Sequence, residues 1–460
     1  MPSASDDSKA AWSVREAPNP DGHNTCVTLL DSVHGLGPRM YELCRELYPI
    51  CRSITGDGVR HTLDVVGKEI PLTRTEVPSG TQAFDWTVPL EWNVRDAYVL
   101  DATGRRVVDF NRSNLHVMSY SVPVDEVLTL DELRHHLLTM PDRPALVPYR
   151  TSYYEEGWAF CMSDDERNGL PDGTYRAVID STLEPGALTY GECVIPGATT
   201  DEVVISCHVC HPSLANDNLS GIAVVTHLAR ALAGRDLRYS YRLLFIPGTI
   251  GSIVWLSQHE EAVRRIRHGL VVAGVGDRAP FTYKRSRRGG ADIDRAMAHV
   301  LRAGPDHQIV DFTPYGYDER QFCSPGFNLP FGRLSRSVHG EHPEYHTSAD
   351  DLDFVTAAQL EQSLETIASV VDVLEGNRRY RNLQPDCEPQ LGRRGLYRAV
   401  GGAVDSRSVE MGMLWVLNLS DGTNDLLEIA DRAGLSFASI RQAAEALASH
   451  GLLAPLEGKE

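Results

Sequence analysis

Two neighbouring segments, Ser206-Cys207-His208-Val209-Cys210-His211 and Ala215-Asn216-Asp217-Asn218-Leu219-Ser220-Gly221, decide how this chain is interpreted. His208 follows the apolar run Val203-Val204-Ile205, which is typical of a buried strand. Asp217 precedes the run Ile222-Ala223-Val224-Val225, which is typical of a helix start. In α/β sheets the chemistry usually lies on loops at the ends of such elements. Because imidazole and carboxylate are both zinc ligands, the two segments predict a zinc site.

The bulk composition is that of an ordinary globular protein. The 460 residues are enough for several domains, and 42% of them are hydrophobic and 23% charged. A formal net charge of −19 argues against nucleic acid and anionic membrane as partners, since both require clustered Lys and Arg. No run approaches the roughly 18 apolar residues of a membrane span. Nine cysteines, sparse and odd in number, fit reduced thiols, so we expect a cytoplasmic protein.

The residue pattern predicts an α/β catalytic domain with an inserted mainly-β domain. Residues 1–27 are polar, show no signal-peptide pattern and are expected to be a flexible tail. Residues 28–72 are helical in character, whereas residues 73–191 consist of short alternating segments separated by turns. In residues 192–376 strands and helices alternate, which predicts a mixed sheet covered by helices. Because helices precede the β region, we interpret residues 73–191 as an insertion. The expected strands are Val203–Ser206, Arg242–Ile246, Leu270–Val275, Ile309–Thr313 and Leu329–Arg333.

The C-terminal part is expected to be a small helical module, residues 395–460, after a polar linker, residues 377–394. Its helix-turn-helix consists of Asp425–Ala433 and Ser436–Ser449. Such a motif can bind DNA, but this module is net acidic, and phosphate neutralisation dominates DNA affinity. We therefore expect no nucleic-acid partner. Homo-oligomerisation through this module is the interpretation that we keep open.

Three later segments are also rich in ligand-type side chains. They are Gly274-Val275-Gly276-Asp277, Tyr317-Asp318-Glu319-Arg320 and the run from His339 to Asp350. Ordinary explanations also exist: His208 and Asp217 could be a buried hydrogen-bonded pair, Asp318 and Glu319 a solvated loop, and Asp350 a helix cap. Cys207 and Cys210 could instead indicate a thiolate zinc site. However, no second Cys/His pair lies at the spacing that four closed ligands require.

In this order, the segments resemble the zinc aminopeptidase family typified by bacterial leucyl aminopeptidase, which includes the glutaminyl cyclases. The closest resemblance is to an aminopeptidase-like subgroup with an inserted β domain and a C-terminal winged helix. It covers nearly the whole chain after the N-terminal tail and implies a zinc-exopeptidase-like fold. The metal ligands that it implies are His208, Asp217 in Asp217-Asn218-Leu219-Ser220-Gly221, Asp277, and His346 in His346-Thr347-Ser348-Ala349-Asp350.

The sequence departs from the family at two places. The family's Glu-Glu pair, a general base followed by a zinc ligand, falls within Phe245–Ser252, which contains no carboxylate. Cys210 stands where the family has an Asp. The resemblance then leaves His208, Asp217 and Asp277 as three ligands, and three ligands plus water suit a catalytic zinc. We therefore expect one Zn²⁺. His346 could join through Asp217 if a second ion binds.

Another residue must replace the general base missing at Gly248. The candidates are Asp318, which matches a family Asp that supports the site, and Glu319, Glu341, Glu344 and His339. For substrate binding we expect Tyr345 and Arg336, whose guanidinium could hold a carboxylate. Tyr153, Tyr154 and Trp158 of the inserted domain could line a cleft, although core packing is the default for aromatic residues.

These residues and the resemblance together predict a zinc-dependent, aminopeptidase-like hydrolase. Its expected substrate contains an amide, in a peptide or an amino-acid-linked compound such as a biosynthetic intermediate. Two alternatives stay open, because the Glu-Glu pair is missing. One is zinc-dependent acyl transfer or cyclisation, and the other is a degenerate peptidase that serves as a binding or scaffold protein.

Overall fold

The computed structural model describes residues 28–396 and 406–456. The expected flexible tail, residues 1–27, lies outside the described residues. The chain divides into two units. The first unit contains residues 1–291 and 305–368, and the second contains residues 292–304 and 369–460.

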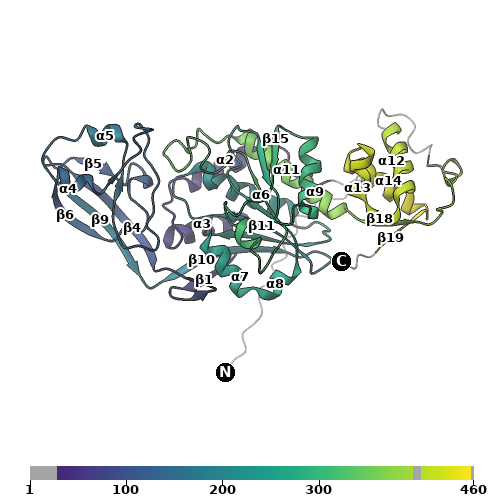
Figure 1. The fold of residues 1–460 in the computed structure, drawn as a ribbon, viewed down its shortest axis with the longest axis horizontal. Coiled ribbons are helices and arrows are strands. Elements are labelled where there is room, and N and C mark those ends of the chain that lie inside the picture. Colours follow the sequence, from purple (N-terminus) through teal and green to yellow (C-terminus); the bar gives the residue numbers. More distant parts are fainter. Residues whose placement is uncertain (1–27, 397–405, 457–460) are drawn as a thin grey trace, which may run out of the picture. The chain divides into compact units, whose positions relative to one another are not determined.

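A mixed eight-stranded sheet forms the centre of the first unit (Figure 1), which confirms the predicted fold class. The four strands β12, β11, β13 and β16 run parallel, and β1, β10 and β14 join them in antiparallel pairs. All residues of β11 are buried, because helices cover the sheet, and this explains the continuous apolar run before His208. In spatial order the strands are β1 (Thr73–Pro78), β10 (Ala187–Ile195), β12 (Ser240–Ile246), β11 (Glu202–His208), β13 (Ile266–Val272), β16 (Phe331–Ser335), β14 (Phe281–Lys284) and β15 (His307–Val310).

Helices that precede and follow the inserted region in the sequence pack against this sheet. The helices α3 and α7 contact β10, and α6 contacts β11. Helix α2 buries one face, which contains Met40, Leu43 and Leu47. The helices of the first unit are α1 (Leu29–Val33), α2 (Gly37–Leu47), α3 (Asp57–Glu69), α6 (Gly221–Leu232), α7 (Ile250–Gln258), α8 (Glu260–Arg265), α10 (Glu319–Phe322) and the first part of α11 (Ala357–Gly376).

Between β1 and β10 the chain forms a separate antiparallel sheet in the order β5-β4-β9-β6 (Figure 1). Its strands are β4 (Glu91–Leu100), β5 (Arg106–Asp109), β6 (Val124–Thr129) and β9 (Thr174–Glu184). Shorter elements complete the insertion: β2 (Gln82–Ala83), β3 (Trp86–Thr87), η1 (Asn114–His116), α4 (Leu130–Arg134), β7 (Leu137–Leu138), β8 (Phe160–Cys161) and α5 (Asp164–Asn168). The expected limits at residues 73 and 191 were wrong by one strand each. Both β1 and β10 hydrogen-bond into the large sheet rather than into the inserted one.

Three further details of the large sheet differ from the sequence prediction. The strand expected at Leu270–Val275 ends at Val272, and Gly274 adopts a left-handed φ of +65°. The strand expected at Ile309–Thr313 ends at Val310. Strand β14 was not expected at all. It is only four residues long, so its pattern is too short to separate from a loop.

The second unit contains the predicted helix-turn-helix, α13 (Leu426–Ala433) and α14 (Phe437–Ser449). A three-stranded sheet in the order β18-β17-β19 accompanies it, formed by β17 (Arg379–Asn382), β18 (Asp421–Asp425) and β19 (Leu453–Pro455). Strand β17 lies in the segment expected to be a linker, so that interpretation was wrong there. The unit is completed by α9 (Asp292–Arg302), the end of α11, η3 (Gly392–Arg394) and α12 (Ser406–Leu419).

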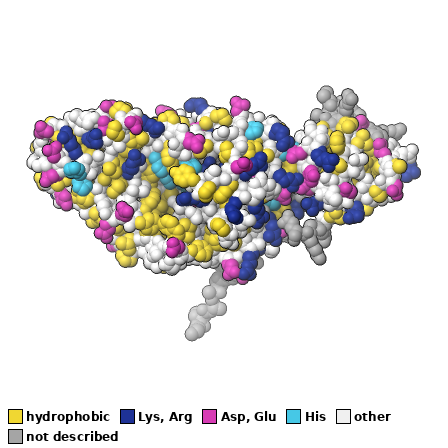
Figure 2. Space-filling model, viewed as in Figure 1, with side chains coloured by type: hydrophobic (Ala, Val, Ile, Leu, Met, Phe, Trp, Pro, Cys, Tyr) yellow, Lys and Arg dark blue, Asp and Glu magenta, His cyan; other side chains and the backbone are white. Residues whose placement is uncertain are grey.

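Acidic and basic side chains are interspersed on the face shown in Figure 2. Within residues 28–396 and 406–456, no helix combines the length and hydropathy that crossing a membrane requires. The cysteines of this part of the chain are all free.

Candidate metal centre

The turn Ala215–Ser220, between β11 and α6, holds Asp217 in a fixed position. The backbone N–H groups of Asn216 and Asp217 donate to the Asp350 carboxylate at 2.6 and 3.0 Å. Asp350 therefore caps this turn, not the following helix α11 that the sequence suggested. A carboxylate 133 residues away in sequence thus fixes the backbone of the predicted ligand.

The motif Asp217-Asn218-Leu219-Ser220-Gly221 is explained by packing around the Asn218 carboxamide. This carboxamide donates to the Val272 carbonyl oxygen at 3.1 Å and contacts His208 Nδ1 at 3.3 Å. A Cβ atom at Gly221 would lie 2.4 Å from Asn218 Oδ1 and 2.6 Å from the Val272 oxygen. Glycine is thus required here by the close approach of backbone and side chain.

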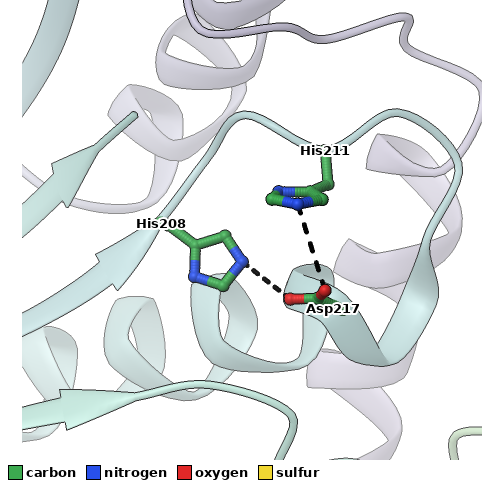
Figure 3. Close-up of side chains that lie close together, drawn as sticks. All are labelled: His208, His211 and Asp217. Carbon is green, nitrogen blue, oxygen red and sulfur yellow. Dashed lines mark hydrogen bonds and ion pairs between the residues drawn. The ribbon is translucent and has the colours of Figure 1, made fainter. Parts of the chain in front are cut away.

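Two imidazoles face the Asp217 carboxylate, that of His208 from the end of β11 and that of His211 from the loop that follows (Figure 3). His208 Nε2 lies 2.7 Å from Asp217 Oδ1, and His211 Nε2 lies 4.0 Å from Oδ2. Ligand atoms of these three residues all lie within 4.8 Å of one another. His208 and Asp217 are buried, and His211 is half-buried.

A third imidazole, that of His346, reaches the same carboxylate from the loop between β16 and α11. Its Nε2 lies 3.2 Å from Asp217 Oδ2. Both of these atoms are buried and have no hydrogen-bond partner among the described residues. The structure therefore brings together three of the four predicted ligands, His208, Asp217 and His346, and adds His211 to them. These four residues are called the metal group below.

The protonation states of this group suit metal binding. Burial alone would raise the pKa of Asp217, but its interactions with the surrounding imidazoles, first His211 and then His208, outweigh burial and hold that pKa well below its ordinary value. Burial lowers the pKa of His211 to about 3. The group thus offers an ionised carboxylate and a neutral imidazole, which are the forms that bind metal.

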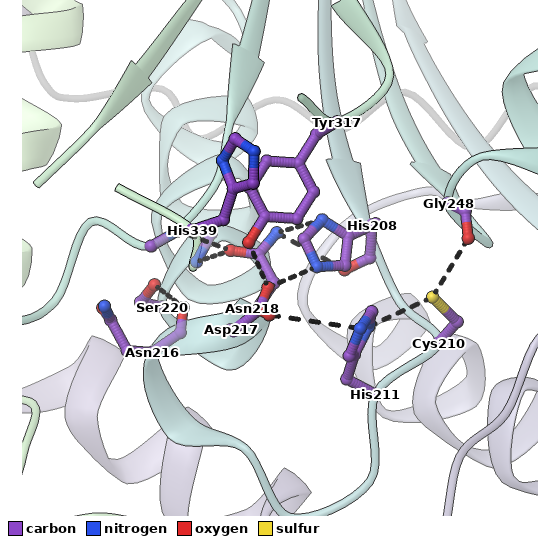
Figure 4. A network of polar contacts seen from close by, with 12 residues as sticks. His208, Cys210, His211, Asn216, Asp217, Asn218, Ser220, Gly248, Tyr317 and His339 are labelled. Carbon is purple, nitrogen blue, oxygen red and sulfur yellow. Dashed lines mark hydrogen bonds and ion pairs between the residues drawn. The ribbon is translucent and has the colours of Figure 1, made fainter. Parts of the chain in front are cut away.

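His211 belongs to the segment Ser206–His211 but was not predicted to be a ligand. The signal that could have found it is the spacing of His208 and His211, three residues apart after a buried strand. Cys210 does not supply a thiolate, because burial raises the pKa of its thiol. Its Sγ instead contacts His211 Nδ1 at 3.2 Å (Figure 4). This supports the interpretation of Cys210 as a small buried residue.

Asp277 is not part of this group, although the resemblance implied it as a ligand. One carboxylate oxygen accepts from the Asn216 carboxamide at 2.8 Å and the Ser337 N–H at 3.2 Å. The other accepts from the Ala279 N–H at 2.7 Å and the Ser337 hydroxyl at 3.0 Å. Four donors thus occupy the carboxylate of Asp277, and in the described chain no other ligand-type side chain closes a metal group with it. Its role here is to hold Asn216 and Ser337.

Asp318 lies beside Gly248, the position where the resemblance places the missing base. A Cβ atom at Gly248 would lie 3.4 Å from Asp318 Oδ2 and 3.1 Å from His208 Cβ. The Ser252 hydroxyl donates to Asp318 Oδ1 at 2.9 Å, whereas the buried Oδ2 has no partner among the described residues. Burial raises the pKa of Asp318 to about 6, although His208 and the Ser252 hydrogen bond oppose it.

Two other candidate bases, Glu319 and Glu341, do not occupy such a position. Glu319 is fully buried and pairs with Lys284 Nζ at 2.8 Å and Arg333 Nη1 at 3.5 Å. Its Oε1 is therefore engaged by two buried cations and lies in a structural ion-pair chain. The side chain of Glu341 is exposed on the loop between β16 and α11. No contact with a described residue places it near Asp217.

His339 and Tyr345 lie close to the metal group through aromatic contacts. Tyr345 stacks on His346, with ring centroids 3.9 Å apart, so its ring lies beside a predicted ligand. His339 packs at 5.0 Å against Tyr317. Tyr317, which was not predicted, stacks on His208 and donates to Asp217 Oδ1 at 3.1 Å (Figure 4).

Arg336, the predicted carboxylate-binding residue, is instead part of the protein interior. Its guanidinium donates to the Val275 carbonyl at 3.3 Å, the Ala279 carbonyl at 2.8 Å and Gln362 Oε1 at 2.6 Å. It also lies over the Phe281 ring. All of these partners are protein groups, so the guanidinium is not free to bind a substrate carboxylate.

The inserted domain reaches the site through Tyr149, another residue that the sequence did not single out. Its ring centroid lies 5.2 Å from His211 and 5.0 Å from His346. The Tyr149 hydroxyl also hydrogen-bonds to that of Tyr153 at 2.8 Å. Of the aromatic residues expected at a cleft, Trp158 stacks on His136, and Tyr154 is 53% exposed beside Trp86.

Known proteins are similar to both parts of the chain. Residues 41–377 match the family model described as "Domain of unknown function (DUF4910)", and residues 378–455 match a winged helix-turn-helix model. A curated Clostridium acetobutylicum protein is 51% identical over 412 residues, which cover 89% of this chain and 95% of that protein. Its name, given as provisional, is polysaccharide biosynthesis protein with aminopeptidase-like domain.

Solved structures of other proteins have a similar fold. The crystal structure of a protein from Clostridium acetobutylicum, provisionally named a peptidase, has a TM-score of 0.88 at 48% identity and covers 93% of this chain and 98% of its own. A zinc aminopeptidase from Bacillus subtilis has a TM-score of 0.54 at 12% identity, covering 73% of this chain and 94% of its own. This second likeness shows a zinc-exopeptidase-like fold. On the family match, which spans most of its length, the chain belongs to the DUF4910 family and carries an additional winged helix-turn-helix domain.

Proposed function

We propose that this protein is a zinc-dependent hydrolase that cleaves an amide bond in a peptide or an amino-acid-linked substrate. The observation that carries the proposal is the Asp217 carboxylate, which three imidazoles approach and whose Oδ2 is buried without a hydrogen-bond partner in the described chain. Buried polar groups are normally hydrogen-bonded, so an oxygen that faces imidazole nitrogens without forming a hydrogen bond fits a cation. The ligands would be His208, His211 and Asp217, with His346 beside them. When bound, the ion would polarise a carbonyl group and acidify a water molecule.

Asp318 is the proposed general base. The Ser252 hydroxyl orients its carboxylate and leaves Oδ2 free, and Gly248 provides the space next to that oxygen. A carboxylate with a pKa near 6 can accept a proton at neutral pH and then deliver it to the leaving amine. Asp318 would thus perform, from another loop, the role of the missing family glutamate.

The relatives support the proposed substrate class. The fold is that of zinc aminopeptidases, whose substrates carry an amide, and the 51% identical relative is named for polysaccharide biosynthesis. Both are consistent with a substrate in which an amino acid is joined through an amide to an amino sugar. The inserted domain would contribute to its binding through Tyr149, which packs against His211 and His346.

The proposal is tested with the purified full-length chain, stripped of metal and reloaded with zinc. Aminoacyl p-nitroanilides, dipeptides and aminoacyl amides of glucosamine serve as probes, and amine release is followed by absorbance and mass spectrometry. We expect about one zinc per chain and release of amine that stops with chelator. Protein that takes up no zinc would contradict the proposal and favour the scaffold alternative. Zinc uptake with a cyclised or transferred product would favour acyl transfer.

A further inference from the structure

His339 lies on the loop between β16 and α11 and faces a buried arginine. Its Nδ1 lies 3.0 Å from Arg333 Nη1, and its ring packs at 5.0 Å against both Tyr315 and Tyr317. Figure 4 shows His339 beside Tyr317, whose hydroxyl reaches the Asp217 carboxylate. His339 is therefore one aromatic ring away from the metal group.

The contact with Arg333 fixes the tautomer of His339. A guanidinium carries only donors and stays protonated, so the nitrogen that faces it must accept. Nδ1 of His339 thus carries no proton, and a neutral imidazole then carries its single proton on Nε2. Burial, followed by the charge of Arg333, also lowers the pKa of His339 to about 4, which keeps the ring neutral.

Arg333 is itself held in place by buried charged residues. It lies on β16 and is 2% exposed, and its Nη1 is 3.5 Å from Glu319 Oε1. Lys284, also 2% exposed, holds the same oxygen at 2.8 Å. This buried chain, Lys284–Glu319–Arg333, gives the cation little freedom to leave His339. It also provides a use for Glu319 that does not involve proton transfer.

The other ring nitrogen of His339, Nε2, is buried and makes no hydrogen bond in the described part of the chain. A buried N–H without an acceptor is costly, and in native proteins such a group commonly has a functional explanation. A substrate oxygen that reached this atom would supply the missing acceptor.

We infer that His339 is a catalytic hydrogen-bond donor, whose Nε2–H binds the carbonyl oxygen of the substrate amide as negative charge develops on it. This inference rests on the proposed hydrolase function. It excludes His339 as the base, because Nδ1 is occupied by Arg333 and Nε2 already bears the proton. Proton transfer is left to Asp318, and the two residues act on different atoms of the substrate.

The tautomer is tested without reference to activity. Protein labelled with ¹⁵N-histidine is examined by long-range ¹H–¹⁵N correlation at pH 7, and His339 is identified by the signal that His339→Gln removes. We expect an Nε2–H pattern that does not change between pH 5.5 and 8. A ring protonated on Nδ1, or on both nitrogens, at pH 7 would overturn the inference whatever the enzyme does.

The contact with substrate is tested with an α-aminophosphonate, whose tetrahedral oxygens resemble the charge that develops during amide hydrolysis. In zinc-loaded protein it should shift the His339 Nε2 signal. His339→Ala should lower kcat by about 100-fold with little change in KM, as for removal of one donor to an oxyanion. His339→Gln should recover part of the loss, because its carboxamide N–H can replace Nε2–H.

The possible failures are distinguishable. Protein that takes up no zinc contradicts the proposed function, and the tautomer measurement still stands by itself. Zinc uptake without an aminophosphonate-induced change at Nε2 overturns the donor role alone. An alanine variant that keeps wild-type kcat also overturns it. Because His339 lies on a half-exposed loop, circular dichroism can verify that each variant is folded before its kinetics are compared.

Discussion

Asp217 and Asp277 are two buried carboxylates that follow the carboxyl ends of the neighbouring strands β11 and β13, but their surroundings differ. Asp217 is approached by the imidazoles of His208, His211 and His346, and its Oδ2 accepts no hydrogen bond from the described residues. Asp277 accepts four hydrogen bonds from amide and hydroxyl donors. Both residues were predicted to be metal ligands. The difference between them teaches that hydrogen-bond partners, and not residue type, separate a ligand from a structural carboxylate.

The largest effect is expected from Asp217→Asn. The substitution keeps the shape of the side chain but removes the charge at the centre of the imidazole group, so the protein should lose nearly all bound zinc. Elemental analysis after dialysis measures this. Asp277→Asn is the matched control at the same sheet edge and should retain the metal. Equal loss of zinc from the two variant proteins would break the distinction between these carboxylates.

Next in size is the effect of Asp318→Asn. The amide cannot accept a proton, so kcat should fall by about 100- to 10,000-fold, the usual contribution of a general base. Zinc content should stay unchanged, which distinguishes a base from a ligand. The test uses steady-state kinetics on the best probe substrate, with Glu341→Gln, a change on an exposed loop, as control. A variant as active as the wild type would show that Asp318 is not the general base.

The pH dependence of kcat/KM gives a third measurement on Asp318. Burial raises the pKa of this carboxyl to about 6, and below its pKa the group is protonated and cannot act as base. A bound cation nearby would lower that pKa, so the acid limb of the profile should lie at or below pH 6. Activity should fall there by about tenfold per pH unit. A limb near pH 7 that persists in the Asp318→Asn protein would point to another base.

The smallest effects are expected for Arg336 and Asp277, whose side chains bind only other groups of the protein. Arg336→Met should lower the free energy of unfolding by about 3 kcal/mol, because buried carbonyl groups lose a charged donor. KM should not change, since the guanidinium binds protein groups only. Asp277→Asn should cost about 2 kcal/mol for the same type of reason. Denaturant unfolding of the zinc-loaded proteins measures both, and a selective rise in KM for Arg336→Met would restore its predicted role in substrate binding.

Much of the fold could be predicted from sequence because its signals are local. The apolar run before His208 and the caps of α13 and α14 lie within a few residues of the elements that they define. The predictions failed at β1, β10 and β17, because the sheet to which a strand belongs is decided by its distant partner. Strand β1, for instance, pairs with residues 187–192, more than a hundred positions further along the chain.

The site was predictable only in part, for the same reason. His208, Asp217 and His346 were found through motifs. The exclusion of Asp277 and Arg336, and the free oxygen of Asp318, depend on groups far away in sequence. Asn216 and Asp277, for example, are 61 positions apart. His211 was visible in the sequence, but its approach to Asp217 requires the turn that Asp350 holds.

By itself, the sequence determined the mixed α/β sheet, the C-terminal helix-turn-helix and the segment that carries most of the proposed metal ligands. These follow from side-chain periodicity and from turn motifs, which act over a few residues. Only the tertiary structure decided which acids are free and which are occupied. The reason is physical: whether a buried carboxylate can bind a metal or a proton depends on every donor around it, and folding brings those donors from separate loops.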